Sequence, residues 1–165
     1  MPLITVTSEK NNRYIALLDG KELGILIYPK WYSQDAEIEI GRTQYIIKNK
    51  GFWRTDSEVL KVGKMLFRIK TKWRGTVIIK FNEPHHPYML EPKGWFSNGY
   101  VLKDYTGKDV FVMTQEFSWK KWSSGFEACS HIDMEDEDSK VLLMVSLHYY
   151  RSALNAAATG VVAAT

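Results

Sequence analysis

The sequence feature that most restricts the fold is a stretch near the C-terminus, residues 139–154, with the pattern of a long helix. From Val141 to Tyr150 it contains no Asp, Glu, Lys or Arg, and at 100° per residue its apolar side chains occupy every angular sector. A helix that is apolar all round must be buried on every side or lie in a membrane. We expect a core helix at about 138–154, capped by Asp138 or Ser139. Its predicted buried side chains are Val141, Leu142, Leu143, Met144, Val145 and Leu147.

Polar residues within this segment disfavour the membrane alternative. A spanning helix needs about 20 mainly apolar residues, but Ser146, His148, Arg151 and Asn155 interrupt this one. An arginine near a helix centre costs roughly 2.5–3.5 kcal/mol on insertion, whereas each leucine or valine contributes only about 0.3–0.6 kcal/mol. We therefore expect no transmembrane span. His148, Arg151 and Asn155 share one helix face, which we expect to approach a rim or solvent, with His148 a core or rim histidine rather than a metal ligand.

Upstream of this segment the sequence is typical of short antiparallel strands. Apolar and polar residues alternate, as in Ala36–Ile40, and turn residues such as Asp19-Gly20 separate one stretch from the next. We expect about 11 to 12 strands and no helix among them. The predicted strands are 3–7, 13–18, 23–28, 36–40, 43–48, 52–55, 65–70, 76–81, 88–91, 96–103, 109–116 and 126–132.

The number of strands favours a barrel over a sandwich. About eight strands make a barrel whose interior side chains can fill, and the diameter grows with strand number. A barrel of 11 to 12 strands therefore needs another occupant, and a helix with its side chains is roughly 10–12 Å across. We predict a mainly β fold, a closed antiparallel barrel of about 12 strands around a central hydrophobic C-terminal helix.

The chain of 165 residues is the size of one domain. We expect a single barrel domain over residues 1–154, with 155–165 as a helix extension or a flexible Ala-rich tail. The single cysteine, Cys129, excludes an intrachain disulfide framework. No secretory signal pattern opens the chain, so we expect a cytoplasmic location. No cofactor and no metal site are expected.

The order of these elements resembles the tubby C-terminal-like superfamily, which includes tubby domains, phospholipid scramblases and LURP-one-related proteins. The similar features are residues 136–147, where acidic residues precede the apolar helix, and hairpins such as 100–113 with a turn at 104–107. The resemblance implies a closed barrel of 12 strands around the C-terminal helix. It also implies binding to membrane phospholipid or phosphoinositide, as in tubby domains, or lipid translocation, as in scramblases. The sequence has no calcium-binding segment and no cysteine cluster of the scramblase kind.

A basic stretch at 61–74 is the leading candidate for a binding site. Alternation places Arg68, Lys70 and Lys72 on one strand face, with Trp73 near a turn. Three interpretations remain open, namely a solvated outer face, an anionic phospholipid surface bound peripherally and a nucleic acid. The candidate anion-binding residues are Lys61, Lys64, Arg68, Lys70, Lys72, Trp73 and Arg74.

Two other motifs carry weaker signals. Residues 119–122, Trp-Lys-Lys-Trp, predict either a second interfacial loop or strand residues on two faces. His85-His86 lies among prolines, and adjacent residues of an extended chain point in opposite directions, which disfavours a shared metal ion. No catalytic motif was found. We therefore expect a non-enzymatic binding module, with a structural or protein-interaction domain as a further alternative.

Overall fold

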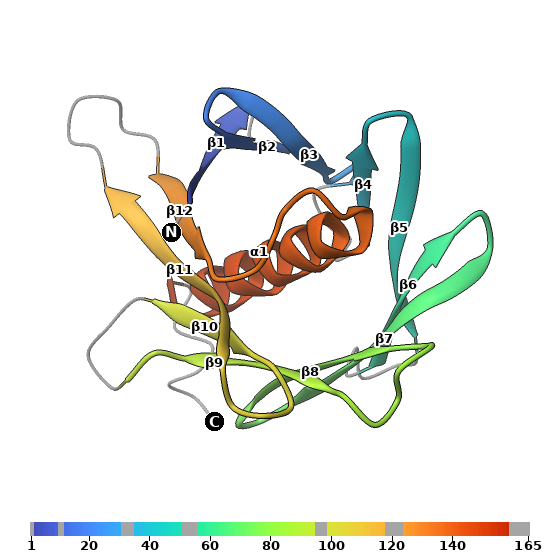
Figure 1. The fold of residues 1–165 in the computed structure, drawn as a ribbon. Helices are drawn as coiled ribbons and strands as arrows, with labels where there is room; N and C mark the ends of the chain where they lie inside the picture. The colour runs from blue at the N-terminus through green and yellow to red at the C-terminus, as the bar shows by residue number, and fades with distance from the viewer. Residues whose placement is uncertain are drawn as a thin grey trace.

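The computed structural model contains a closed barrel of twelve antiparallel strands with one helix inside it (Figure 1). It describes residues 2–9, 12–30, 35–50, 56–94, 99–117 and 124–158. The predicted fold class is confirmed. The elements are β1 (Leu3–Glu9), β2 (Arg13–Leu18), β3 (Lys21–Ile27), β4 (Ala36–Ile40), β5 (Thr43–Lys50), β6 (Asp56–Lys61), β7 (Lys64–Lys72), β8 (Gly75–Lys80), β9 (Tyr88–Pro92), β10 (Tyr100–Lys103), β11 (Asp109–Phe117), β12 (Ser124–Ser130) and α1 (Glu137–Ala158).

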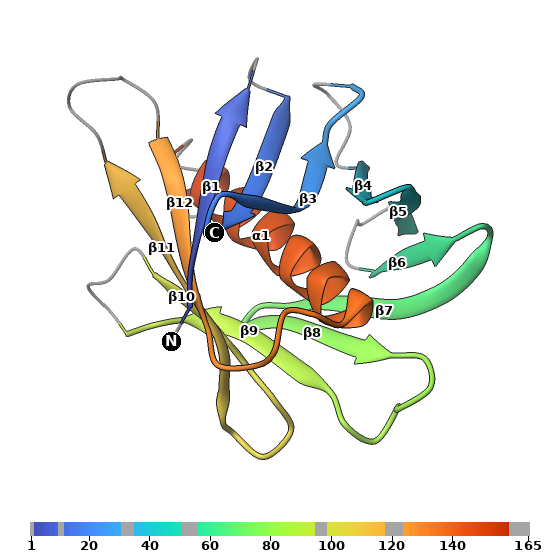
Figure 2. The ribbon, with the colours of Figure 1, turned by 45° about the horizontal axis from the view of Figure 1, so that its top comes forward.

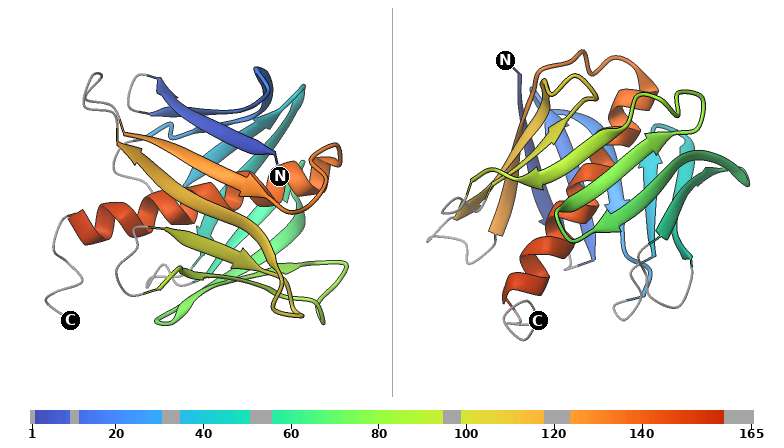
Figure 3. Two further views of the ribbon diagram at one scale, coloured as in Figure 1. Left: turned by 60° about the vertical axis from the view of Figure 1, so that its left-hand side comes forward. Right: turned by 90° about the horizontal axis from the view of Figure 1, so that it is seen from below.

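Each strand pairs with its neighbours in the sequence, and β1 pairs with β12 to close the barrel. Because consecutive strands run in opposite directions, their connections alternate between the two ends of the barrel. We call the end where α1 begins the N rim and the end where α1 finishes the C rim (Figure 3). The N rim consists of connections 19–20, 41–42, 62–63, 81–87, 104–108 and 131–136. Of the described residues between strands, the C rim contains residues 12, 28–30, 35, 73–74, 93–94 and 99.

The inner face of the barrel and the helix bury one another. Strand β4 shows the pattern, since Ala36, Ile38 and Ile40 are buried while Glu37 and Glu39 point outward. Figure 2 shows α1 enclosed by the ring of strands. The six predicted core side chains of α1 are all buried, none with more than 3% of its surface exposed. A Cβ atom added at Gly24 of β3 would lie 3.3 Å from the Cγ atom of Met144, so this glycine permits a close approach of the helix.

The helix begins and ends slightly beyond its predicted limits. It starts at Glu137, and the carboxylate of Asp136 accepts hydrogen bonds from the Ser139 backbone N–H and hydroxyl, both at 3.2 Å. The predicted cap at Asp138 or Ser139 was therefore wrong, because a cap bonds to the backbone N–H two or three residues later and Asp136 has that spacing. At the other end α1 continues to Ala158, and residues 159–165 lie outside the described part of the chain.

One strand was missed in the sequence. The predicted strand 52–55 lies entirely within residues that the structure does not describe, and β6 follows at Asp56–Lys61. In β6 only Ser57 and Val59 are buried, so a serine occupies one of the inward positions. Because this inward residue is polar, β6 lacks the alternation of apolar and polar residues by which a strand is recognised in a sequence.

We predict that shortening a side chain at the centre of α1 destabilises the whole domain. Leu143 is fully buried, and Leu143→Ala should lower the free energy of unfolding by about 2–5 kcal/mol, because the helix cannot move to close the cavity inside a closed barrel. Denaturant unfolding monitored by far-UV circular dichroism measures this.

The matched control is Leu154→Ala, in the half-buried part of the same helix. We expect this control to cost clearly less, about 1 kcal/mol. Equal effects at Leu143 and Leu154 would contradict the burial of the helix centre.

Candidate functional site

The barrel separates the seven candidate anion-binding residues into three groups. Lys61 and Lys64 flank the β6–β7 turn at the N rim, while Arg68 and Lys70 lie on the outer face of β7. Lys72, Trp73 and Arg74 form or adjoin the β7–β8 turn at the C rim. Eight residue steps along β7 separate Lys64 from Lys72, about 26 Å in an extended strand. The seven residues therefore do not form a single site.

Two lysines at the N rim pair with carboxylates at the start of the helix. The Nζ atom of Lys61 lies 3.7 Å from Oε1 of Glu137, and the Tyr45 hydroxyl donates to the same carboxylate. Burial, followed by this carboxylate, raises the pKa of Tyr45. A second lysine, Lys80, approaches Asp138 with Nζ and Oδ2 2.8 Å apart, and this hydrogen bond raises the pKa of Lys80. The positive charge of Lys61 thus already has a carboxylate partner within the fold.

The two cations in the middle of β7 lie beside acidic residues of the neighbouring strand β6. The β6–β7 register sets Arg68 opposite Glu58 and Lys70 opposite Asp56. Glu58 also forms an ion pair with Lys50 of β5 at 3.0 Å. Because β6 was not expected to be a strand, these two carboxylates could not be placed beside β7 from the sequence. Basic and acidic side chains therefore alternate across this outer face.

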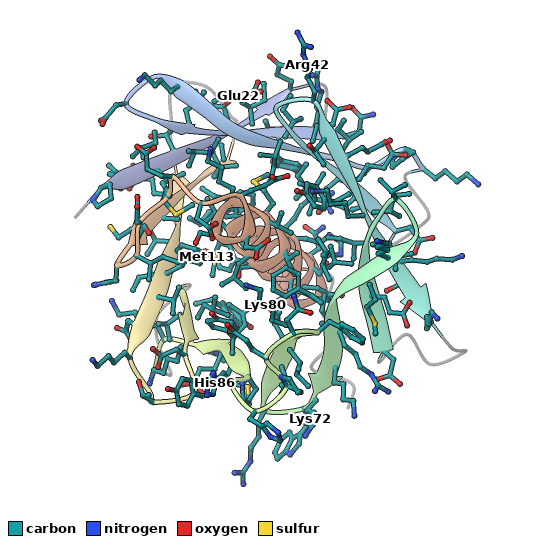
Figure 4. All side chains as sticks on the ribbon, turned by 45° about the vertical axis from the view of Figure 1, so that its right-hand side comes forward. Glu22, Arg42, Lys72, Lys80, His86 and Met113 are labelled. Carbon is teal, nitrogen blue, oxygen red and sulfur yellow. The ribbon has the colours of Figure 1, made fainter. Side chains whose placement is uncertain are left out.

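The β7–β8 turn presents an aromatic side chain between two cations. Trp73 is 95% exposed, and Lys72 and Arg74 are exposed on either side of it. Neither cation takes part in an ion pair identified among the described residues. Figure 4 shows Lys72 pointing away from the barrel, in contrast to Met113, which lies in the interior. Gly75, the first residue of β8, lies against β9, because an added Cβ atom there would be only 2.5 Å from the Leu90 carbonyl oxygen.

A second feature of the C rim is a cluster of four side chains at the mouth of the barrel, which we call the mouth cluster: Tyr14, Tyr28, His148 and Arg151. The Arg151 Nε atom donates to the Tyr14 hydroxyl at 2.9 Å, and its guanidinium carbon lies 4.2 Å from the centroid of the Tyr28 ring. The Tyr28 hydroxyl and Nδ1 of His148 are hydrogen-bonded at 2.8 Å. His148 is 2% exposed and Arg151 half-buried, whereas Asn155 is exposed. The predicted polar helix face therefore runs from the interior to the rim.

Burial fixes the charge state of the histidine in this cluster. Desolvation, followed by the positive charge of Arg151, lowers the pKa of His148 to about 3. The imidazole is therefore neutral at physiological pH. It serves as a hydrogen-bonded core group, as predicted, rather than as an exposed titratable group.

The remaining sequence candidates contribute little to a site. Residues 119–122 lie within the part of the chain that the structure leaves undescribed. The His85-His86 loop is exposed, and the His86 ring stacks on Tyr105 with centroids 4.1 Å apart. Among the described residues, no group of three or more His, Cys, Asp or Glu side chains is placed to hold a metal ion. In the same residues, no helix combines the length and apolar character needed to cross a membrane.

No protein-family model, curated protein or solved structure matches this chain. The architecture itself, twelve antiparallel strands closed around one C-terminal helix, is compatible with the tubby-like barrel that the sequence resembles. The candidate site must therefore be judged from its own geometry. By that measure the strongest feature is the β7–β8 turn.

We predict that His148 makes the domain less stable in mild acid. Its proton binds more weakly in the folded chain than in the unfolded chain, where the pKa is 6.5. As the pH falls below 6.5 the unfolded state takes up the proton first, so stability declines between pH 6.5 and about 3. Through His148, the free energy of unfolding should fall by about 2 kcal/mol between pH 7 and pH 5.

The test is urea unfolding at several pH values for the native chain and for His148→Phe, which should lack this part of the slope. Tyr28→Phe is the matched control, because it removes the 2.8 Å hydrogen bond but leaves the histidine buried. The control should be less stable by about 1 kcal/mol at every pH while keeping the native slope. A native slope in His148→Phe would show that this histidine is not the group responsible.

Proposed function

We propose that this protein is a non-enzymatic binding module that associates peripherally with anionic phospholipid membrane surfaces through the β7–β8 turn. The observation that carries the proposal is Trp73, 95% exposed and flanked by the exposed Lys72 and Arg74. The resemblance to tubby-like barrels, which implies a lipid ligand, supports the same class of partner.

The chemistry of this turn suits a membrane interface. Tryptophan is enriched at the boundary between headgroups and acyl chains, because its ring is apolar and its N–H is polar. An anionic leaflet attracts each lysine or arginine near its surface by about 1 kcal/mol. Lys72 and Arg74 lie on the same turn as the tryptophan, so one approach to a surface brings all three into contact. A single exposed aromatic would need no explanation, but one placed between two cations at the tip of a hairpin does.

Three of the four other candidate cations are less suited to this role. Lys61 is paired with Glu137, and Arg68 and Lys70 lie opposite Glu58 and Asp56 in the strand register. An anionic surface that approached the middle of β7 would therefore meet carboxylates as well. We assign binding to Lys72, Trp73 and Arg74.

We predict that Lys72→Gln/Arg74→Gln weakens binding to anionic vesicles about 30-fold, from about 1 kcal/mol for each charge. The measurement is flotation with vesicles of phosphatidylcholine alone and of phosphatidylcholine with phosphatidylserine, at low and high salt. Native protein should float only with the anionic vesicles, and less at high salt. Trp73→Ala should weaken binding about tenfold through lost apolar contact, with the salt dependence retained.

The matched controls lie at the N rim. Arg42→Gln/Lys108→Gln removes the same charge from two exposed turns, and Phe81→Ala removes an exposed aromatic ring. We expect both controls to float like the native protein. Equal flotation of the native protein with both vesicle types would refute the assignment. So would an equal loss of flotation in the variants of the β7–β8 turn and in their N-rim controls. Tight, salt-sensitive binding to single-stranded nucleic acid without flotation would instead support a nucleic-acid function.

A further inference from the structure

A cavity of about 330 Å³ lies at the N rim, beside the start of α1. Its described lining comes mainly from the end of β2, the start of β3, the connection between β12 and α1, and the first turn of α1. Small-molecule sites in proteins occupy roughly 300–1,000 Å³, so this cavity has room for a small ligand. Because the β7–β8 turn lies at the other rim, a ligand here would be separate from the proposed lipid contact.

Four of the lining side chains are apolar and are held by the core of the barrel. Leu23 is 7% exposed and Met134 5% exposed. Leu18 and Ile132 are half-buried and pack against the core. Since packing fixes these side chains, the cavity offers an apolar surface that can cover a short aliphatic group.

Five other lining side chains are charged, and they are of both signs. They are the carboxylates of Glu22, Asp133 and Glu135 and the ammonium groups of Lys21 and Lys140. None of the five takes part in an ion pair identified among the described residues. Positive and negative groups therefore surround one cavity without pairing with one another.

Lys140 lies where a cation is unfavourable unless an anion is close to it. It belongs to the first turn of α1, which begins at Glu137, and the N-terminal end of a helix carries about half a positive charge. Lys140 is also half-buried. An anionic group of a ligand would give this ammonium a partner that the described part of the fold does not supply.

The connection that carries two of the carboxylates is held in place by its own hydrogen bonds. The Asp133 carboxylate accepts a hydrogen bond from the Glu135 backbone N–H at 3.1 Å. The Ser130 hydroxyl accepts one from the Ile132 backbone N–H at 3.2 Å and donates to the Ile132 carbonyl oxygen at 2.7 Å. These bonds position both carboxylates before a ligand arrives, and such preorganisation reduces the cost of binding.

We propose that this cavity binds a free α-amino acid with an apolar side chain, such as leucine. At neutral pH a free amino acid carries an ammonium and a carboxylate. The carboxylate would meet Lys140 and Lys21, the ammonium would meet Glu22 and Glu135, and the aliphatic side chain would lie against the four apolar residues.

Other classes of small ligand fit the cavity less well. A ligand that carries negative charge alone would be repelled by three carboxylates, and one that carries positive charge alone would be repelled by two lysines. A pure hydrocarbon would remove charged groups from water without giving them a partner. A zwitterion with a short apolar body satisfies both the charges and the apolar surface.

The first experiment is a leucine titration followed by NMR of protein labelled at the methionine methyl groups. The Met134 signal should move, because this side chain lines the cavity, whereas that of Met113 in the barrel interior should not. We expect saturation with a dissociation constant of about 1 mM or lower. A Met134 signal that does not move at about 10 mM leucine would overturn the proposal.

Leucine derivatives test whether both charges of the ligand are recognised. N-acetyl-leucine keeps the carboxylate and lacks the ammonium, leucinamide keeps the ammonium and lacks the carboxylate, and glycine lacks the apolar side chain. Each should bind about tenfold more weakly than leucine. N-acetyl-leucine and leucinamide also represent the C-terminus and the N-terminus of a peptide, so binding of either one as tight as that of leucine would contradict a site for a free amino acid.

Protein variants assign the two charges to named residues. Lys140→Gln should weaken leucine about tenfold and leave leucinamide unchanged, whereas Glu22→Gln/Glu135→Gln should weaken leucine and leave N-acetyl-leucine unchanged. The controls are Lys48→Gln and Asp56→Asn, exposed residues of β5 and β6, which should bind leucine like the native protein.

Native affinity for leucine in Lys140→Gln, or the same loss in the two controls, would refute the assignment. These titrations contain no lipid, and the flotation experiments contain no amino acid. Failure of the amino-acid site therefore leaves the proposed membrane function standing, and failure of flotation leaves the amino-acid site standing.

Discussion

The structure depends on one mutual constraint, the enclosure of an all-round apolar helix by a closed sheet. From Val141 to Leu147 every side chain of α1 is buried, including that of Ser146, whose hydroxyl donates to the Leu142 carbonyl oxygen at 2.7 Å. The barrel in turn has twelve strands, more than side chains alone can fill. Neither element has another way to remove its apolar surface from water, so each one specifies the other.

This enclosure also determines how the surface charges are used. At the N rim, Lys61 and Lys80 pair with the first carboxylates of α1, which fasten the start of the helix to β6 and β8. Acidic residues there suit the positive end of the helix dipole. At the C rim the helix is held by packing and by the mouth cluster, where Arg151 meets tyrosine rings and a hydroxyl. Among the described residues, Lys72 and Arg74 form no ion pair with the helix, which is consistent with a role in binding.

The sequence predicted the helix and the barrel because both rest on local patterns. The charge-free run at 141–150 and the alternation of strands such as β4 are readable within a few residues. Strand β6 was missed because Ser57 occupies an inward position, and with it the acidic partners of β7 were missed. The mouth cluster was beyond prediction for a different reason, since Tyr28 and His148 are 120 residues apart and meet only because the barrel closes. The division of the basic stretch between two rims likewise follows from strand length and direction, not from composition.

The central claim, that helix and barrel stabilise each other as one unit, is tested most directly by native-state hydrogen exchange measured residue by residue. Amides in the buried part of α1 and in the central strands should open with the same free energy, equal to that of global unfolding. Their opening free energies should also respond alike to low concentrations of denaturant. Fast exchange in α1 while the strands stay protected would show that the barrel stands without its helix, and would contradict the account.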